Sequence, residues 1–181
     1  MSTLLRRFPR RAQVIPVFGV IAIVIYTWTL MRFFWKLPSW LYFLNGGEIV
    51  ASVAYLLVIN FLESLAFLCG PLLLAFVLPE KWFRDVFVAR GTGLALAGLG
   101  CMMLLAEQFN NFNDYPTLSL PLWPVALALA GIAVLVYLCG RIALLRRVLE
   151  AVADRVSIFA YVLTPLSLLS LALVVVRSAL G

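Results

Sequence analysis

Histidine is missing from this 181-residue sequence, and charged residues make up only 12% of it. Without histidine the chain lacks both the commonest general base and the commonest transition-metal ligand. A soluble domain carries about a quarter charged and about half apolar residues, whereas 65% of this chain is apolar and its mean hydropathy is +1.08. So few charges cannot cover a water-exposed surface. The composition excludes a soluble globular enzyme and predicts a polytopic membrane protein.

Motifs for catalysis and metal binding are lacking as well. No CxxC pair or zinc-type spacing occurs, because the three cysteines are far apart in apolar runs: Cys69, Cys101 and Cys139. Metal-dependent lipid phosphotransferases need clustered aspartates, but here the aspartates stand apart, at Asp85, Asp114 and Asp154. No Walker or dinucleotide-binding glycine pattern is present either. We therefore expect no enzymatic activity, no cofactor and no metal site.

Long apolar runs dominate what is present, and a spanning helix needs about 20 such residues. The sequence predicts an all-α bundle of five transmembrane helices, which form a single transmembrane domain over residues 1–181. The predicted spans are 14–34, 49–78, 88–106, 122–140 and 156–176. The second span is longer than a hydrocarbon core requires, and Pro71 predicts a kink in it. A pair of short re-entrant helices is the alternative for this span.

Basic residues alternate between the two sides of the predicted spans. Four precede the first span, three lie between the second and third, and four between the fourth and fifth. The opposite side has three: Arg32, Lys36 and Arg177. Because cytoplasmic loops carry the excess of Lys and Arg, this bias predicts the N-terminus inside and the C-terminus outside. The net charge of +6 is thus explained by topology and anionic lipid, and we expect no nucleic-acid partner.

Aromatic residues crowd the first predicted outer loop, Arg32–Glu48, where Pro38 is expected to break the helix. Tryptophan and tyrosine favour the headgroup level of a membrane. The loop is therefore interpreted as an interfacial segment or as a binding face for a lipid, pigment or helix, with Trp35, Trp40 and Tyr42 as its main residues.

Two further segments outside the spans are informative. The second outer loop, Glu107–Pro124, has asparagines beside aromatic rings, a pattern that suits either turns or a sugar or lipid headgroup. On the inner side, Arg141–Val156 is amphipathic. We expect that segment to extend the fourth helix or to lie along the inner membrane surface.

One carboxylate, Glu63, falls near the middle of a span. Charge at that depth costs at least about 2.5–3.5 kcal/mol, so such a residue is a functional candidate by default. Asn60 and Ser64 lie at helical spacing from it, and together the three predict a polar stripe that points away from lipid. Three interpretations remain open. Glu63 is a neutral acid bonded to the fifth span near Thr164, Ser167 or Ser170, it belongs to a proton or cation path, or it contacts a bound partner or cofactor.

Small residues mark one face of the third span, at Gly93, Ala97, Gly100 and Cys101. Such a face lets another helix backbone approach closely, within the chain or between chains. This face, the aromatic loop and the missing catalytic motifs together predict a non-catalytic membrane subunit that binds other helices and lipid, or a homo-oligomer. The alternatives are a small oligomeric transporter or channel that uses Glu63, and an accessory protein in envelope lipid or glycan handling. A bacterial inner membrane is the expected location.

Overall fold

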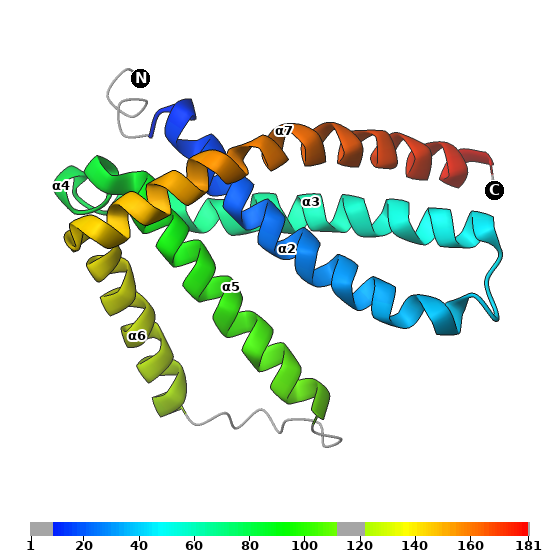
Figure 1. The fold of residues 1–181 in the computed structure, drawn as a ribbon, viewed down its shortest axis with the longest axis horizontal. Helices are drawn as coiled ribbons and strands as arrows, with labels where there is room; N and C mark the ends of the chain where they lie inside the picture. Colours follow the sequence, from blue (N-terminus) through cyan, green and yellow to red (C-terminus); the bar gives the residue numbers. More distant parts are fainter. Residues whose placement is uncertain (1–8, 112–121, 181) are drawn as a thin grey trace.

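The computed structural model describes residues 9–111 and 122–180, and no strand occurs in these two ranges. Six α-helices and one 3-10 turn follow one another along the chain (Figure 1): α2 Arg11–Trp40, α3 Gly46–Val77, α4 Glu80–Phe83, η1 Arg84–Val86, α5 Phe87–Asn111, α6 Leu122–Arg141 and α7 Ala143–Leu180. The predicted all-helical class is confirmed.

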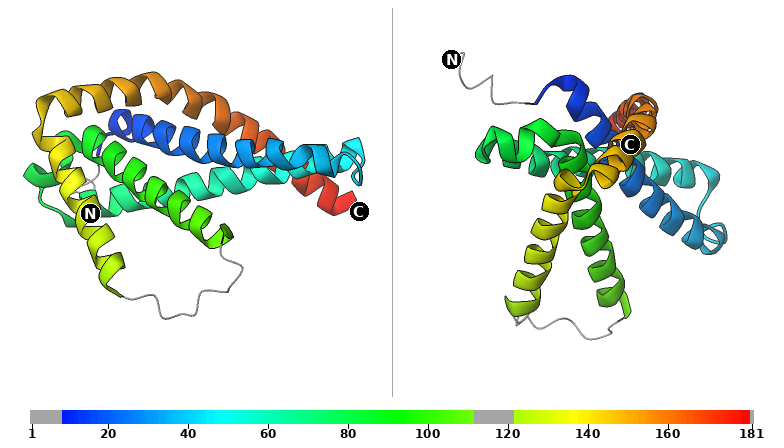
Figure 2. Two further views of the ribbon diagram at one scale, coloured as in Figure 1. Left: turned by 60° about the horizontal axis from the view of Figure 1, so that its bottom comes forward. Right: turned by 60° about the vertical axis from the view of Figure 1, so that its left-hand side comes forward.

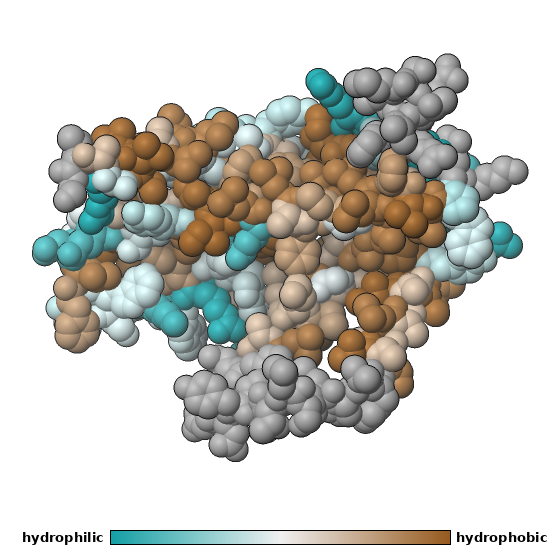
Figure 3. Space-filling view, turned by 180° about the vertical axis from the view of Figure 1, so that it is seen from behind, coloured by the Kyte–Doolittle hydropathy of each residue, from teal (hydrophilic) through white to brown (hydrophobic). Residues whose placement is uncertain are grey.

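Four of the helices are long and apolar enough to cross a membrane: Arg11–Trp40, Gly46–Val77, Arg84–Glu107 and Ala143–Ala179. Val125–Arg141 in α6 is a shorter apolar segment. Apolar side chains also cover most of the face in Figure 3 between the two ends of the elongated bundle. These features are consistent with a multi-pass membrane protein with four to five apolar helices.

The long helices alternate in direction (Figures 1 and 2). The start of α2, the short α4 and the junction of α6 with α7 lie at one end, and the turn between α2 and α3 lies at the other. α2, α3 and α7 pack along one another, whereas α5 and α6 leave this group at an angle and spread apart towards their outer ends. The core lies where α2, α3 and α5 meet, around Val17, Ile21, Leu68 and Phe87.

Gly19 sets the crossing of α2 over α7. A Cβ atom at this position would lie 2.9 Å from the Cα of Ser157 and 3.0 Å from the carbonyl oxygen of Val156. Both atoms belong to the backbone of α7, which cannot move aside as a flexible side chain can. The two helices therefore approach this closely only because residue 19 has no side chain.

The predicted first outer loop is wrong in its extent. α2 continues through Pro38 to Trp40, and only the five residues before α3 lie outside helices. α3 then begins with a cap in which the backbone N–H of Asn45 donates to the carboxylate of Glu48 at 2.8 Å. This Asn-x-x-Glu pattern is visible in the sequence and marks the start of the helix at Gly46, three residues before the predicted span.

α3 agrees with the expectation of one helix, whereas α7 begins before the predicted fifth span. α3 is one continuous helix with Pro71 inside it, not a re-entrant pair. The sequence predicts that the amphipathic segment Arg141–Val156 extends the fourth helix or lies along the inner membrane surface, and the first of these two predictions is wrong. The helical run stops at Ile142 and restarts at Ala143, so this segment forms the first part of α7. Its surface pair joins Arg146 Nε to Glu150 Oε1 at 2.9 Å.

Replacing Gly19 with alanine should destabilise the fold by about 1–3 kcal/mol, because the added methyl group overpacks a backbone contact. Gly131→Ala in α6 is the matched control, since a Cβ atom there would meet nothing within 4 Å. The measurement is thermal unfolding of both purified variants in detergent, followed by circular dichroism. Equal stability of the two variants would contradict the proposed role of Gly19.

Candidate functional site

The three polar residues predicted to share one stripe of α3 lie in two environments. Asn60 and Ser64 are buried, at 1% and 0% exposure, whereas the Glu63 side chain is exposed. Successive helix residues are about 100° apart, so Ser64 and Glu63 cannot both face the core of a bundle this small. In the described part of the chain, Glu63 makes no hydrogen bond or ion pair. It therefore does not bond to Thr164, Ser167 or Ser170.

The buried side of this face belongs to a hydrogen-bond network that joins α2, α3 and α7. The Tyr26 hydroxyl of α2 donates to the carbonyl oxygen of Leu57 in α3 at 3.1 Å. The same hydroxyl lies 2.5 Å from the Ser167 hydroxyl of α7. Because the Tyr26 proton goes to Leu57, the Ser167 hydroxyl donates to Tyr26, and the carbonyl oxygen of Leu163, 2.8 Å from Ser167, is the alternative acceptor for the same proton. One tyrosine thus connects three helices through neutral groups.

A second link between α2 and α3 lies one turn farther along. The side-chain amide of Asn60 donates to the Thr29 hydroxyl at 2.6 Å, and Thr29 donates to the carbonyl oxygen of Ile25 at 2.8 Å. The Ser64 hydroxyl bonds to the carbonyl oxygen of Asn60 at 2.7 Å. Hydrogen bonds of this kind hold apolar helices together where few other polar contacts are available. The network is suited to fixing the relative positions of three helices.

The small-residue face of α5 contacts α6 at Gly93 but makes no close contact at Gly100. A Cβ atom at Gly93 would lie 2.8 Å from the sulfur of Cys139, so α5 and α6 touch there. At Gly100 a Cβ atom would meet nothing within 4 Å, because the two helices spread apart towards that end (Figure 2). Ala97 and Cys101 are half-buried. The predicted face therefore supports one tight contact between α5 and α6, and at Gly100 it makes no comparable contact with the described residues.

α2 extends beyond the predicted first span, so Trp35 and Trp40 lie on this helix and Tyr42 lies in the turn that follows it. Trp35 lies on the helix and is 87% exposed, and Tyr42 in the following turn is 86% exposed. Trp40 ends α2 and packs edge-on against Phe33, with ring centroids 5.5 Å apart. Trp35 also lines a cavity of about 530 Å³ between α2 and α5.

This cavity is organised by a charge pair that the sequence analysis missed. Arg32 forms an ion pair with Glu107 of α5 and lies over the ring of Trp28, 4.7 Å from its centroid. The sequence predicts a different loop for each of these two residues, and no spacing rule connects positions 75 residues apart. The predicted loop Glu107–Pro124 is wrong in its extent, because α5 continues to Asn111 and α6 begins at Leu122, and residues 112–121 between them fall outside the described residues.

Comparison with protein-family models, with curated proteins and with solved structures finds no match to this chain. Among the described residues, no group of three or more histidine, cysteine or acidic side chains comes together in a way that could hold a metal ion.

Tyr26→Phe should destabilise the bundle by about 0.6–1.7 kcal/mol, the range of interhelical hydrogen bonds in membrane proteins. Tyr55→Phe is the control, because that tyrosine is 45% exposed on α3. Unfolding is measured for both variants and in a double-mutant cycle of Tyr26→Phe with Ser167→Ala. Additive effects in the cycle would show that the two hydroxyls do not interact.

Proposed function

We propose that this chain is a non-catalytic integral membrane subunit that binds other transmembrane helices and lipid within a larger assembly. Its N-terminus lies on the cytoplasmic side and its C-terminus on the opposite side of a bacterial inner membrane. The orientation is supported by the alternating directions of the helices together with the basic residues, most of which belong to the end that holds the start of α2 and the α6–α7 junction.

The observation that carries this proposal is the position of Glu63. It lies about 21 Å or more from either end of α3, at 1.5 Å per residue. Its exposed neighbours on the helix are apolar: Ile59, Leu62 and Ala66. A carboxylate on a lipid-facing surface at this depth is strongly unfavourable without a hydrogen-bond partner. A partner helix that places a donor against Glu63 would remove this penalty.

The chemistry of that partner follows from the carboxylate. A Lys, Arg, Asn or Gln side chain at matching depth can donate to it, and an Arg can do so through two parallel bonds. The basic residues of this chain lie towards the ends of its helices. A second copy of the chain could therefore offer Glu63 no cationic side chain at this depth, and its one nearby amide, Asn60, is buried and already donates to Thr29. We thus favour a foreign subunit over a homo-oligomer.

A second surface fits the same role. A Cβ atom at Gly100 of α5 would meet nothing within 4 Å, and most described side chains of α6 are exposed. Small residues let a foreign helix approach closely, which strengthens packing where no hydrophobic effect drives association.

A transporter or channel is the alternative. The structure separates Glu63 from Asn60 and Ser64, so a polar path lined by Glu63 would have to lie between several copies of the chain. This alternative therefore requires a homo-oligomer, which distinguishes it from the subunit proposal.

Glu63→Leu should lower retention of the foreign subunit tenfold or more, because a hydrogen bond to a charged group contributes about 1.5–3 kcal/mol. Glu63→Gln keeps one donor and one acceptor and should retain the partner in part. Ile59→Leu, an exposed apolar change on the same helix, should retain it fully. The measurement is mild purification from the native membrane followed by intact-complex mass spectrometry.

A parent protein that proves alone and monomeric would contradict the proposal. A homo-oligomer would shift the interpretation to transport, which liposome flux of the parent and of Glu63→Gln would then test.

A further inference from the structure

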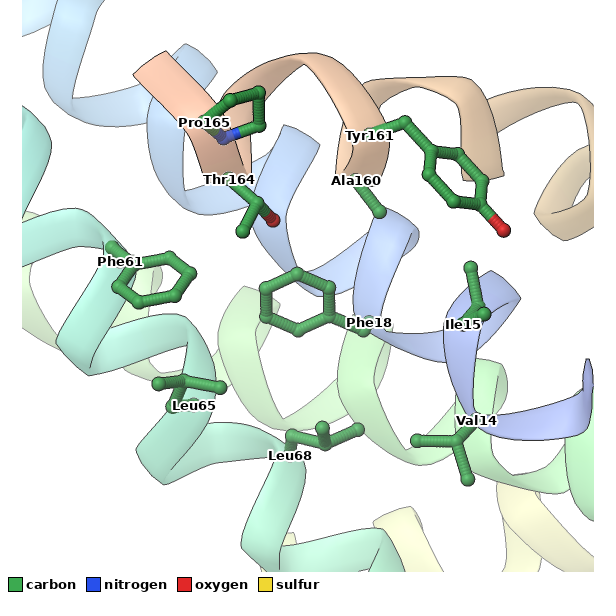
Figure 4. A pocket seen from close by; sticks show the side chains of 10 residues that line it. All are labelled: Val14, Ile15, Phe18, Phe61, Leu65, Leu68, Ala160, Tyr161, Thr164 and Pro165. Carbon is green, nitrogen blue, oxygen red and sulfur yellow. The ribbon is translucent and has the colours of Figure 1, made fainter. Parts of the chain in front are cut away.

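An apolar groove opens between α2, α3 and α7 (Figure 4). Its volume of about 460 Å³ lies within the range of about 300–1,000 Å³ that small-molecule sites occupy. The groove begins at Val14 and Ile15, near the start of α2, and continues past Phe18 to Phe61 and Pro165. In the proposed orientation it therefore lies in the half of the bundle nearest the N-terminal side of the membrane.

Two hydroxyl groups interrupt the apolar walls. Thr164 lies beside Phe18 in the inner part of the groove, and the Tyr161 hydroxyl points towards Ile15 near its beginning (Figure 4). Neither hydroxyl makes a hydrogen bond within residues 9–111 and 122–180. Pro165 has no N–H, so the carbonyl oxygen of Tyr161 also loses its usual helical donor. The groove thus offers hydrogen-bond donors along an otherwise apolar channel.

Two arginines lie directly beyond the beginning of the groove. Arg11 precedes Val14 by three residues and Ile15 by four, so these three positions share one face of α2. Arg10 adjoins it, and both arginines are exposed. Neither guanidinium group forms an ion pair in the described part of the chain. An anion at this end of the groove would meet two unpaired positive charges.

We propose that this groove binds one anionic glycerophospholipid. An acyl chain occupies the groove along Phe18 and Phe61, the Tyr161 hydroxyl donates to an ester carbonyl one turn deeper than the headgroup, and Arg10 and Arg11 bind the phosphate. The arrangement follows the order of a phospholipid, with charge outermost, then esters, then hydrocarbon.

Selectivity in this site comes from the headgroup. An acyl chain gains little free energy when it leaves the bilayer for the groove, because lipid tails are as apolar as the leucines that line it. Each Lys or Arg near the surface favours an anionic lipid by a factor of about five. The site should therefore prefer phosphatidylglycerol to phosphatidylcholine, although both lipids carry the same chains.

The test uses the full chain in phosphatidylcholine nanodiscs that contain a minor fraction of phosphatidylglycerol, with native mass spectrometry to count the lipids that stay bound. Arg11→Gln should lower phosphatidylglycerol retention about fivefold and leave phosphatidylcholine retention unchanged. Leu65→Trp, which fills the groove from α3, should abolish retention. The controls are Arg177→Gln, which removes a charge near the other end of the bundle, and Leu169→Trp at a 70% exposed position of α7.

Equal retention of the two lipids by the parent protein would overturn the proposal. Undiminished phosphatidylglycerol retention in both Arg11→Gln and Leu65→Trp would overturn it as well. The inference rests on the proposed membrane location but not on a helix partner. Glu63→Leu should therefore keep the bound lipid while it loses the foreign subunit, so failure of one proposal is distinguishable from failure of the other.

Discussion

The close crossing of α2 and α7 at Gly19 is the constraint on which the rest of the bundle depends. Because the two backbones meet at Gly19 and Ser157, Tyr26, two turns farther along α2, comes within 2.5 Å of Ser167. The same approach sets the groove, since Phe18 lies next to the crossing and Ala160 and Thr164 follow it on α7. A larger residue at position 19 would widen the crossing, lengthen the hydroxyl contact and change the shape of the groove together.

Polar groups in the middle of α2 and α3 are divided by type. The neutral hydroxyl of Tyr26 and the amide of Asn60 are buried and bonded to neighbouring helices, whereas the carboxylate of Glu63 faces outward. A neutral network keeps the helices in register without the penalty of a buried charge. The Glu63 carboxylate bonds to none of the described helices, and this is why we propose that it contacts a partner outside the chain.

The sequence predicted the helices better than their faces. Long apolar runs define where helices lie, because run length is a property of consecutive residues. The sequence prediction ended the first helix too early at Pro38, where neighbouring aromatic and apolar residues let α2 continue. It also missed the break at Ile142, where no proline marks the end of α6. It also treated Asn60, Glu63 and Ser64 as one stripe, although the rotation of α3 is set by its neighbours. Gly19 has isoleucine four residues before and after it, so no small-residue pattern signalled its role, and the pairing of Arg32 with Glu107 depends on tertiary structure.

The order of the helices along the chain has a consequence for how the bundle is assembled. The links from α2 to α3, Tyr26 to Leu57 and Thr29 to Asn60, each connect residues only 31 positions apart, so these helices can pair as a hairpin early in synthesis. Ser167 lies 141 positions after Tyr26, and contacts this distant in sequence form late. Docking of α7 is therefore the last step of assembly. Until it occurs, Gly19 has no helix to cross and the groove lacks the wall that α7 supplies.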